Sequence, residues 1–196
     1  MATYRLLKFA DYKRMPWKNG GGSTLEIASD TDETLSGFGW RLSIADVATS
    51  GAFSAFIDYQ RVITVLEGEG MNLEVDGRRS RDLTRLDAFA FSGGSTTYCE
   101  LLNGPIRDFN LIYAPAKYAA RLQWLEGPDE VTLFSSADIV LLFSAAGVTT
   151  LSSSQESGSA LDRYDCGYLE TGGALTTLRL KSEGGQCCLI ELVKIA

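Results

Sequence analysis

The segment RVITVLEGEGMNLEV, residues 61–75, predicts two short antiparallel strands joined by a turn. Its first part is rich in β-branched residues, and the glycines of Glu67-Gly68-Glu69-Gly70 mark the turn. Met71 to Val75 then forms the return strand. The following dipeptide Asp76-Gly77 is a strong hairpin signal, because both positions tolerate positive φ angles. Short strands and tight turns of this kind are typical of antiparallel β-structure.

The rest of the chain continues this pattern, without sustained helical periodicity. Within residues 119–125, Ala120, Leu122 and Trp124 alternate with polar neighbours, which favours a strand over a helix. Other strand-like runs lie at 40–45, 87–92, 97–102, 109–113, 131–134, 139–143, 166–169, 175–180 and 187–193. We therefore predict an all-β fold.

The sequence also repeats itself. DLTRLDAFAFSGG at 82–94 resembles ALDRYDCGYLETGG at 160–173, about 80 residues later. Two halves with the same strand order predict two β-barrels, or jelly rolls, from an internal duplication. Residues 1–115, with the segment PWKNGGG, form the first, and residues 116–196 the second, packed as one globular unit. Chance similarity between two hairpins is the alternative.

Composition restricts the classes of function. The chain has 196 residues and a net charge of −7, which argues against nucleic acid and against an anionic membrane surface as partners. No apolar run is long enough to span a bilayer, and the first residues lack the apolar core of a signal peptide. The four cysteines show no metal-type spacing, so we expect reduced, packing cysteines in a cytoplasmic protein.

The sequence contains no histidine. This excludes Ser-His-Asp and Cys-His catalysis and every metal site that depends on imidazole. No group of acidic residues has the spacing of an EF-hand loop. We therefore expect neither a bound metal nor another cofactor.

Each half resembles the cupin pattern, in which a V-L-x-G-x-G hairpin is followed by a Gly-Asp turn. Here Leu86-Asp87 stands where Gly-Asp is usual. The resemblance places Arg61 near the position of the metal-binding glutamate, residues 54–57 near the first histidines, and Thr97 or Tyr98 near the last. The resemblance implies that this chain has the cupin barrel, and that an arginine occupies the site where metal-binding cupins hold their metal.

The whole chain resembles the HutD/Ves family of bicupin proteins. The resemblance rests on PWKNGGGSTLEI at 16–27, WRLSIADV at 40–47, GAFSAF at 51–56, RVITVLEGEGMNLEV at 61–75 and NGPIRDFNLIY at 103–113. It implies a bicupin fold, a link with bacterial histidine utilisation and no assigned enzymatic activity. It also implies a small pathway acid as ligand, such as N-formylglutamate or urocanate, and a possible homodimer. Ves-like members are associated with cold and stress responses.

A small carboxylate favours an arginine fork, because guanidinium and carboxylate form two parallel charge-assisted bonds. Arg61 is the first candidate, although it could instead pair with a surface carboxylate. Arg41 and Ser43 share one strand face, which could also be a solvent face. Asp108 could hold an arginine in place rather than contact the ligand. The predicted ligand-binding residues are Arg61, Arg41, Ser43, Asn110, Asp108, Trp17, Lys18, Asn19 and Tyr98.

The segment Pro16 to Ile27 raises a separate question, because three consecutive glycines follow Trp17-Lys18-Asn19. It is not a P-loop, since the lysine precedes the glycines. Successive N–H groups could form an anion-binding nest close to the pocket. The alternative is a hairpin turn that covers a sheet edge.

Three functions remain open from the sequence. The first is a metal-free protein that binds a small carboxylate and moderates histidine utilisation. The second is an isomerase or amide hydrolase that uses Asp108, Glu100, Tyr98 or Lys18 as acid and base. The third is an interaction module that uses the barrel faces for protein contacts. We expect the pocket in the first half, where the candidate arginines lie, because the second half offers only Arg179 as an equivalent cation.

Overall fold

A computed structural model describes residues 3–18, 20–31, 37–127, 130–153, 158–182 and 184–195. These residues contain no α-helix, and one 3₁₀ turn lies at Phe9–Asp11. Among them, no helix is long and apolar enough to cross a membrane. The predicted all-β fold is confirmed.

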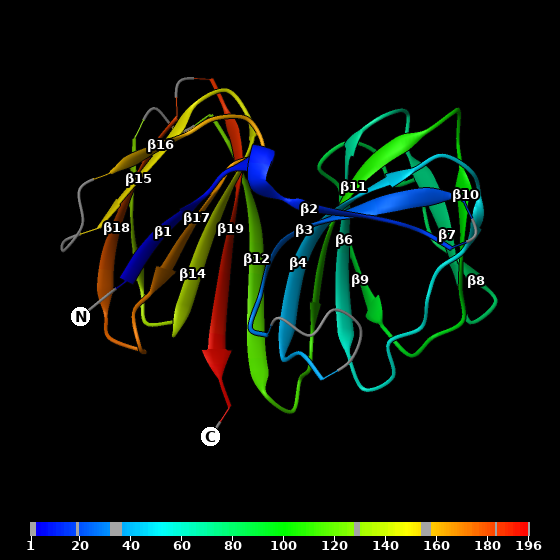
Figure 1. The fold of residues 1–196 in the computed structure, drawn as a ribbon, viewed down its shortest axis with the longest axis horizontal. Helices are drawn as coiled ribbons and strands as arrows, with labels where there is room; N and C mark the ends of the chain where they lie inside the picture. Colours follow the sequence, from blue (N-terminus) through cyan, green and yellow to red (C-terminus); the bar gives the residue numbers. More distant parts are fainter. Residues whose placement is uncertain are drawn as a thin grey trace. The chain divides into compact units, whose positions relative to one another are not determined.

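The described residues form nineteen strands, labelled in Figure 1. Their bounds are β1 Thr3–Leu7, β2 Lys13–Pro16, β3 Gly22–Ser29, β4 Trp40–Val47, β5 Gly51–Ala52, β6 Gln60–Glu67, β7 Met71–Val75, β8 Arg78–Arg79, β9 Ala88–Ser92, β10 Thr97–Leu101, β11 Ile106–Tyr113, β12 Tyr118–Glu126, β13 Val131–Ser135, β14 Ile139–Ala146, β15 Thr149–Ser153, β16 Ser159–Leu161, β17 Cys166–Glu170, β18 Thr176–Ser182 and β19 Gln186–Lys194.

The chain divides into two compact units. Residues 13–117 form one, which we call the N-terminal barrel, and residues 118–196 together with 1–12 form the other, the C-terminal barrel. The division predicted from the sequence differs at the N-terminus, because β1 pairs with β17 of the C-terminal barrel. A paired edge leaves fewer free backbone N–H and C=O groups, which is the physical reason for this assignment.

The N-terminal barrel consists of two antiparallel sheets. One has the strand order β2-β3-β4-β11-β6-β9 and the other the order β5-β10-β7-β8. In Figure 1, β4, β11, β6 and β9 run side by side as one layer. Ten buried apolar side chains form a core cluster in this barrel, namely Ala45, Val47, Ile63, Val65, Met71, Leu73, Leu83, Phe91, Cys99 and Ile106.

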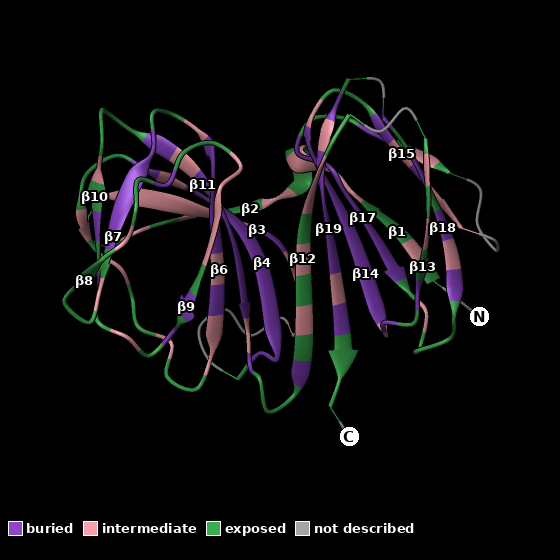
Figure 2. Ribbon diagram, turned by 180° about the vertical axis from the view of Figure 1, so that it is seen from behind, coloured by how far each residue is buried: buried purple, intermediate pink, exposed green. Residues whose placement is uncertain are grey.

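The C-terminal barrel repeats this arrangement with the orders β1-β17-β14-β19-β12 and β13-β18-β15-β16. Figure 2 shows β14 and β17 as buried along nearly their whole length. The interior is filled by apolar side chains, including Val140, Leu142, Leu151, Leu161, Leu169, Leu178, Leu180, Cys187 and Leu189.

The two barrels share one topology. The order β4-β11-β6-β9 corresponds to β12-β19-β14-β17, and β5-β10-β7-β8 corresponds to β13-β18-β15-β16. The register also shifts at the same place, between the pairs Asp108–Val65 and Arg107–Glu67 and between Cys187–Ser144 and Gln186–Ala146. The predicted bicupin with an internal duplication is confirmed at this level.

Two predicted turns have the expected backbone. Asp76 and Gly77 have φ angles of 49° and 76°, which suits the tight hairpin between β7 and β8. Leu86 and Tyr164 have φ angles of 61° and 71°. They occupy matching positions in the two halves, where the cupin pattern has glycine. Both barrels therefore keep the turn geometry of a cupin without its glycine.

Candidate functional site

The N-terminal barrel contains a cavity of about 580 Å³. This volume suits a small organic molecule, since ligand pockets are usually a few hundred Å³ or more. Its lining comes from β2, β3, β4, β6 and β11 and from the loop that follows β5. The lining residues are Met15, Pro16, Trp17, Lys18, Thr24, Arg41, Ser43, Ala45, Ala52, Phe53, Ser54, Phe56, Arg61, Asp108, Asn110 and Ile112.

Strand register brings the predicted polar residues onto one face of the larger sheet. Ile112 pairs with Arg41 on one side and with Arg61 on the other, so both arginines lie in one cross-strand row. Asn110 pairs with Ser43 in the next row, and Asp108 pairs with Ala45 in the third. Alternate residues of a strand share a face, so all three rows point into the barrel.

Arg61 is 6% exposed, and its guanidinium group contacts both hydrogen-bond acceptors and aromatic rings. Its Nη2 donates to Asn110 Oδ1 at 2.9 Å and its Nη1 to the Ser54 carbonyl oxygen at 3.4 Å. Its guanidinium carbon lies 5.0 to 5.6 Å from the ring centroids of Phe91, Phe53 and Phe56. Among the described residues Arg61 forms no ion pair, and its buried Nε has no hydrogen-bond partner. Burial lowers the pKa of Arg61 to about 10.

Arg41 is the second buried cation of the site. It is 8% exposed, and its guanidinium carbon lies 5.0 Å from the ring centroid of Phe38 and 5.3 Å from that of Phe56. Burial lowers the pKa of Arg41 as well. Guanidinium groups stay protonated in proteins at neutral pH, so Arg41 and Arg61 are cations in the cavity wall, where Lys18 is a third.

Among the described lining residues of the cavity, Asp108 is the one acidic side chain, and it is 1% exposed. Its Oδ1 accepts a hydrogen bond from Asn110 Nδ2. Burial raises the pKa of Asp108 to about 7, while the charge of Arg61 and the bond from Asn110 oppose the shift. The carboxyl group therefore changes its charge close to neutral pH.

The hairpin of β2 and β3 forms one wall of the cavity. Trp17 Nε1 donates to Thr24 Oγ1 at 2.8 Å, which fixes the indole ring. A Cβ atom at Gly22 would lie 2.2 Å from the Asp46 carbonyl oxygen and 3.0 Å from the Trp17 ring. The glycine is thus required by close approach. Gly20 closes the turn with a hydrogen bond from its N–H to the Trp17 carbonyl oxygen at 3.1 Å.

These contacts favour the hairpin interpretation of PWKNGGG. The turn joins two strands that extend the sheet beyond β4, and it places Trp17 and Lys18 in the cavity wall. The predicted nest has no support in these bonds, because the Gly20 N–H is used inside the turn. Asn19 lies outside the described residues.

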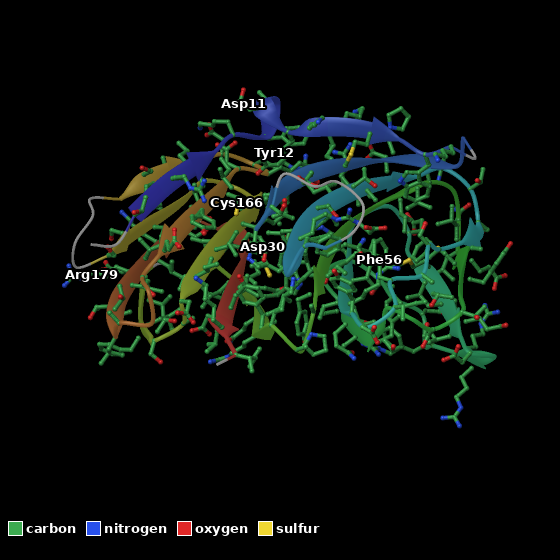
Figure 3. The ribbon with its side chains drawn as sticks, turned by 60° about the horizontal axis from the view of Figure 1, so that its bottom comes forward. Asp11, Tyr12, Asp30, Phe56, Cys166 and Arg179 are labelled. Carbon is green, nitrogen blue, oxygen red and sulfur yellow. The ribbon has the colours of Figure 1, made fainter. Side chains whose placement is uncertain are left out.

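The opposite wall is the loop between β5 and β6. Its Phe56 N–H donates to the Gly93 carbonyl oxygen at 2.7 Å, and the Gly93 N–H donates to the Tyr59 carbonyl oxygen at 2.8 Å. The hydroxyl of Tyr59 donates to the Phe38 carbonyl oxygen at 2.7 Å. Phe56, labelled in Figure 3, therefore sits in a firmly bonded loop beside both arginines.

The structure describes eight of the nine predicted ligand-binding residues, all except Asn19. Seven line the cavity: Arg61, Arg41, Ser43, Asn110, Asp108, Trp17 and Lys18. Tyr98 does not, and this prediction is wrong. It is 49% exposed, because Thr97 and Cys99 beside it point inward and alternation turns Tyr98 outward. Glu100 shares its face and pairs with Arg79 at 2.6 Å.

Sequence reasoning missed several residues of the wall. Phe53, Phe56 and Thr24 hold the arginines and the indole, yet they were not predicted as site residues. The motif GAFSAF contains two of them and was already noted for its resemblance. The spacing of its phenylalanines around Ser54 was the available signal.

No group of three potential metal ligands occurs among the described residues. Cys99, Cys166, Cys187 and Cys188 are free and buried, in agreement with the expected packing role. Burial raises the pKa of all four thiols, to about 12 for Cys99 and about 11 for Cys187. Thiols of this kind are poor nucleophiles at neutral pH.

Comparison with known proteins gives a fold match first. Salicylate 1,2-dioxygenase from Pseudoaminobacter salicylatoxidans, with gentisate adducts, has a TM-score of 0.62 at 9% identity and covers 97% of this chain and 81% of its own. At this identity the similarity concerns the fold alone. It agrees with the two cupin-like barrels described above.

Closer relatives share the sequence as well. A Pseudomonas putida protein, described as an uncharacterized 21.2 kDa protein in the hutC 3′ region, is 54% identical over 98% of this chain and 99% of its own. Protein Ves of Citrobacter koseri is 32% identical over 91% of this chain and 90% of its own. The structure of HutD from Pseudomonas fluorescens SBW25, in a formate condition, has 48% identity and a TM-score of 0.89, covering 99% and 100%.

The HutD family model matches residues 9–189, which is nearly the whole chain. The matched region contains the whole N-terminal barrel, with every described lining residue of the cavity, and most of the C-terminal barrel. The chain therefore belongs to the HutD family.

Proposed function

We propose that this protein binds a small carboxylic acid in the N-terminal barrel, without a metal, and that this binding moderates histidine utilisation. The observation that carries the proposal is Arg61. It is a buried cation in a cavity wall, and among the described residues no carboxylate pairs with it. A buried charge without a counterion is costly, so an anionic ligand would offset this cost.

The cavity charge supports an anion. Three cationic side chains, Arg61, Arg41 and Lys18, line the cavity, and among its described lining residues Asp108 contributes at most one negative charge. Guanidinium groups suit carboxylates, because their planar fork can donate two parallel bonds. The phenyl rings beside the arginines exclude water, which strengthens such bonds.

The role in histidine utilisation rests on the family. HutD of Pseudomonas fluorescens and the Pseudomonas putida protein beside hutC both carry names linked to the hut genes. The candidate acids are therefore intermediates of that pathway, such as N-formylglutamate or urocanate. Formate is a practical first probe, because the related structure was obtained in a formate condition.

Calorimetric titration with matched ligands tests the binding. Each acid is compared with its neutral amide, for example acetate with acetamide and formate with formamide. We expect saturable binding of acids only, with a higher melting temperature, because a ligand of the folded state stabilises it. Equal binding of acid and amide, or no binding of any pathway acid, would contradict the proposal.

A growth experiment tests the role. The host lacking its own copy is complemented with the wild-type gene or with Arg61→Ala, and both strains grow on histidine. We expect the variant to behave like the deletion, while the protein level stays constant. A variant that restores wild-type growth would separate the cavity from the pathway.

A second candidate function is catalysis by Asp108. A buried carboxyl with a pKa raised to about 7, in a cavity wall, has the properties of a general acid or base. Of the other predicted acid–base residues, Lys18 lines the cavity, whereas Tyr98 and Glu100 are not among its lining residues. An NMR time course of each acid that binds would detect turnover. If Asp108 is the catalytic acid or base, the Asp108→Asn variant should show no turnover.

A further inference from the structure

The hydrogen bonds at the base of the cavity all run in one direction. Arg61 Nη2 donates to Asn110 Oδ1, and Asn110 Nδ2 donates to Asp108 Oδ1. The Arg61 end of this chain therefore offers further N–H donors, and the Asp108 end offers a carboxylate acceptor. A complementary ligand has an acceptor at one end and a donor at the other.

The two ends are separated by a ligand-sized distance. Asp108 pairs with Val65, which lies four residues beyond Arg61 on the same strand. Two residues of a strand span about 7 Å, so Asn110 lies about one such step from each end. The Arg61 side chain reaches Asn110, and no ion pair joins Arg61 to Asp108 within 4.0 Å. One small molecule can therefore contact both.

Asp108 has a poorly satisfied carboxyl group. The side chains paired beside it are those of Ala45 and Val65, which cannot form hydrogen bonds. Among the described residues, its only hydrogen bond comes from Asn110. Burial raises the pKa of this carboxyl, against the opposing effects of Arg61 and of the bond from Asn110. A donor from the ligand would give the second oxygen a partner.

We propose that the site selects a monocarboxylate that carries an N–H donor at its far end, with the carboxylate on Arg61 and the N–H on Asp108. The inference rests on the proposed function, because it requires an acid at Arg61. A dicarboxylate would place a second negative charge against Asp108.

A pair of isosteric acids tests this directly. 3-(Pyrrol-2-yl)propanoate and 3-(furan-2-yl)propanoate differ only in an N–H group that is replaced by an ether oxygen. Calorimetry is done at a pH of about 8.5, where Asp108 is ionised. We expect the pyrrole acid to bind about tenfold more tightly, because a hydrogen bond to a charged group is gained and a repulsion is avoided.

Asp108→Asn provides the matched variant. Asn110 Nδ2 still needs an acceptor, so the new amide keeps its oxygen there and turns its NH₂ group toward the ligand. The variant should lose the preference for the pyrrole acid, and the furan acid should bind at least as tightly. The ratio of the two acids' dissociation constants is compared between wild type and variant, because removing one negative charge from the cavity affects both acids alike.

The pH supplies a second readout. The charged or titratable groups that act on Asp108 are Arg61 from β6, Asp46 from β4 and Cys99 from β10, and Arg41 from β4 acts on Arg61. The arginines stay charged, the pKa of Asp46 is lowered by its ion pairs and burial raises that of Cys99 to about 12. Only Asp108 therefore titrates between a pH of about 5.5 and about 8.5, and the pyrrole preference should fall as the pH falls.

The outcomes separate the two proposals. Equal affinity of wild type for both acids, or tighter binding of the furan acid at high pH, overturns the inference on Asp108 and leaves carboxylate binding intact. An unchanged ratio in Asp108→Asn overturns it as well. If neither these acids nor any other acid of the screen binds wild type, carboxylate binding itself is refuted.

Discussion

The two barrels have one topology and opposite interiors. Taking the shared register shift as reference, Val140, Cys187 and Leu189 occupy the positions of Arg61, Asp108 and Asn110. The N-terminal barrel has a polar chain and a cavity there, and the C-terminal barrel has an apolar cluster. The same strand topology can therefore enclose either a polar cavity or an apolar core, because the backbone hydrogen bonds between strands do not depend on which side chains point inward.

The position of Arg41 shows a subtler difference. Arg121 corresponds to it in register, but its side chain is 69% exposed and lies 3.5 Å from Glu191. Glu191 stands where the N-terminal barrel has Ile112. The C-terminal barrel therefore pairs an exposed cation with a carboxylate in this row, whereas the N-terminal barrel buries Arg41 beside the rings of Phe38 and Phe56.

The walls differ as well. Seven residues, 53–59, join β5 to β6 and supply the phenylalanines, whereas three residues, 136–138, join β13 to β14. The strands β2 and β3 extend the N-terminal sheet beside β4, while β12 is the last strand of its sheet. Among the described residues, the cavity and both of these wall segments belong to the N-terminal barrel.

The largest expected effect comes from placing the arginine in the wrong barrel. Val140→Arg buries a cation in an apolar cluster without a partner, and we expect a loss of about 3–5 kcal/mol in the free energy of unfolding. Urea denaturation measures it. The matched variant Arg61→Met should keep or raise the stability of the ligand-free protein. Equal tolerance of both changes would mean that the interiors are interchangeable.

The next effect concerns binding. Arg61→Ala should cost about 2–5 kcal/mol of carboxylate affinity, since it removes one member of a buried charge pair. Arg61→Lys should also bind poorly, because an ammonium cannot reproduce the planar fork. Calorimetry on folded variants is the measurement, with Arg121→Ala as control. Wild-type affinity in a folded Arg61→Ala protein would place the ligand elsewhere.

A pH dependence of stability should follow from Asp108. Its pKa is about 7 in the folded protein, above the ordinary value of about 3.9, so the folded state binds more protons between these values. Stability should fall as the pH rises through this window, by up to about 1.4 kcal/mol per unit. The difference between wild type and Asp108→Asn isolates this contribution. A pH-independent difference would show that Asp108 does not titrate there.

The smallest expected effect is at the tryptophan wall. Thr24→Val removes the hydroxyl that accepts from Trp17 Nε1, at a cost of about 1 kcal/mol in binding or stability. Tryptophan fluorescence should then respond differently to ligand. Thr132→Val, on an exposed strand position of the C-terminal barrel, is the control. If Thr132→Val changed binding or stability more than Thr24→Val does, the Trp17–Thr24 hydrogen bond would have no specific role in the cavity wall.

Sequence alone predicted the strands and their duplication well, because both depend on local patterns. Alternation, β-branched runs and the Asp76-Gly77 turn gave most strands, and the Leu83 and Leu161 segments gave the repeat. Arg61 was predicted from the cupin resemblance, and parity adds that Asp108 and Asn110 share one face of their strand. The segment Thr3–Leu7 could not be assigned, because its partner β17 lies far away in the sequence.

Only the tertiary structure decided which predicted polar residues meet. Parity does not say which face of a strand is inside, so Tyr98 was assigned to the pocket although it points outward. Arg179 was taken as the second barrel's cation, yet it is exposed on β18 and extends away from the strands in Figure 3, while Arg121 holds the corresponding position. The sequence determined a duplicated β-frame with buried arginines. Packing and register, which join distant segments, determined that one half of it encloses a charged cavity.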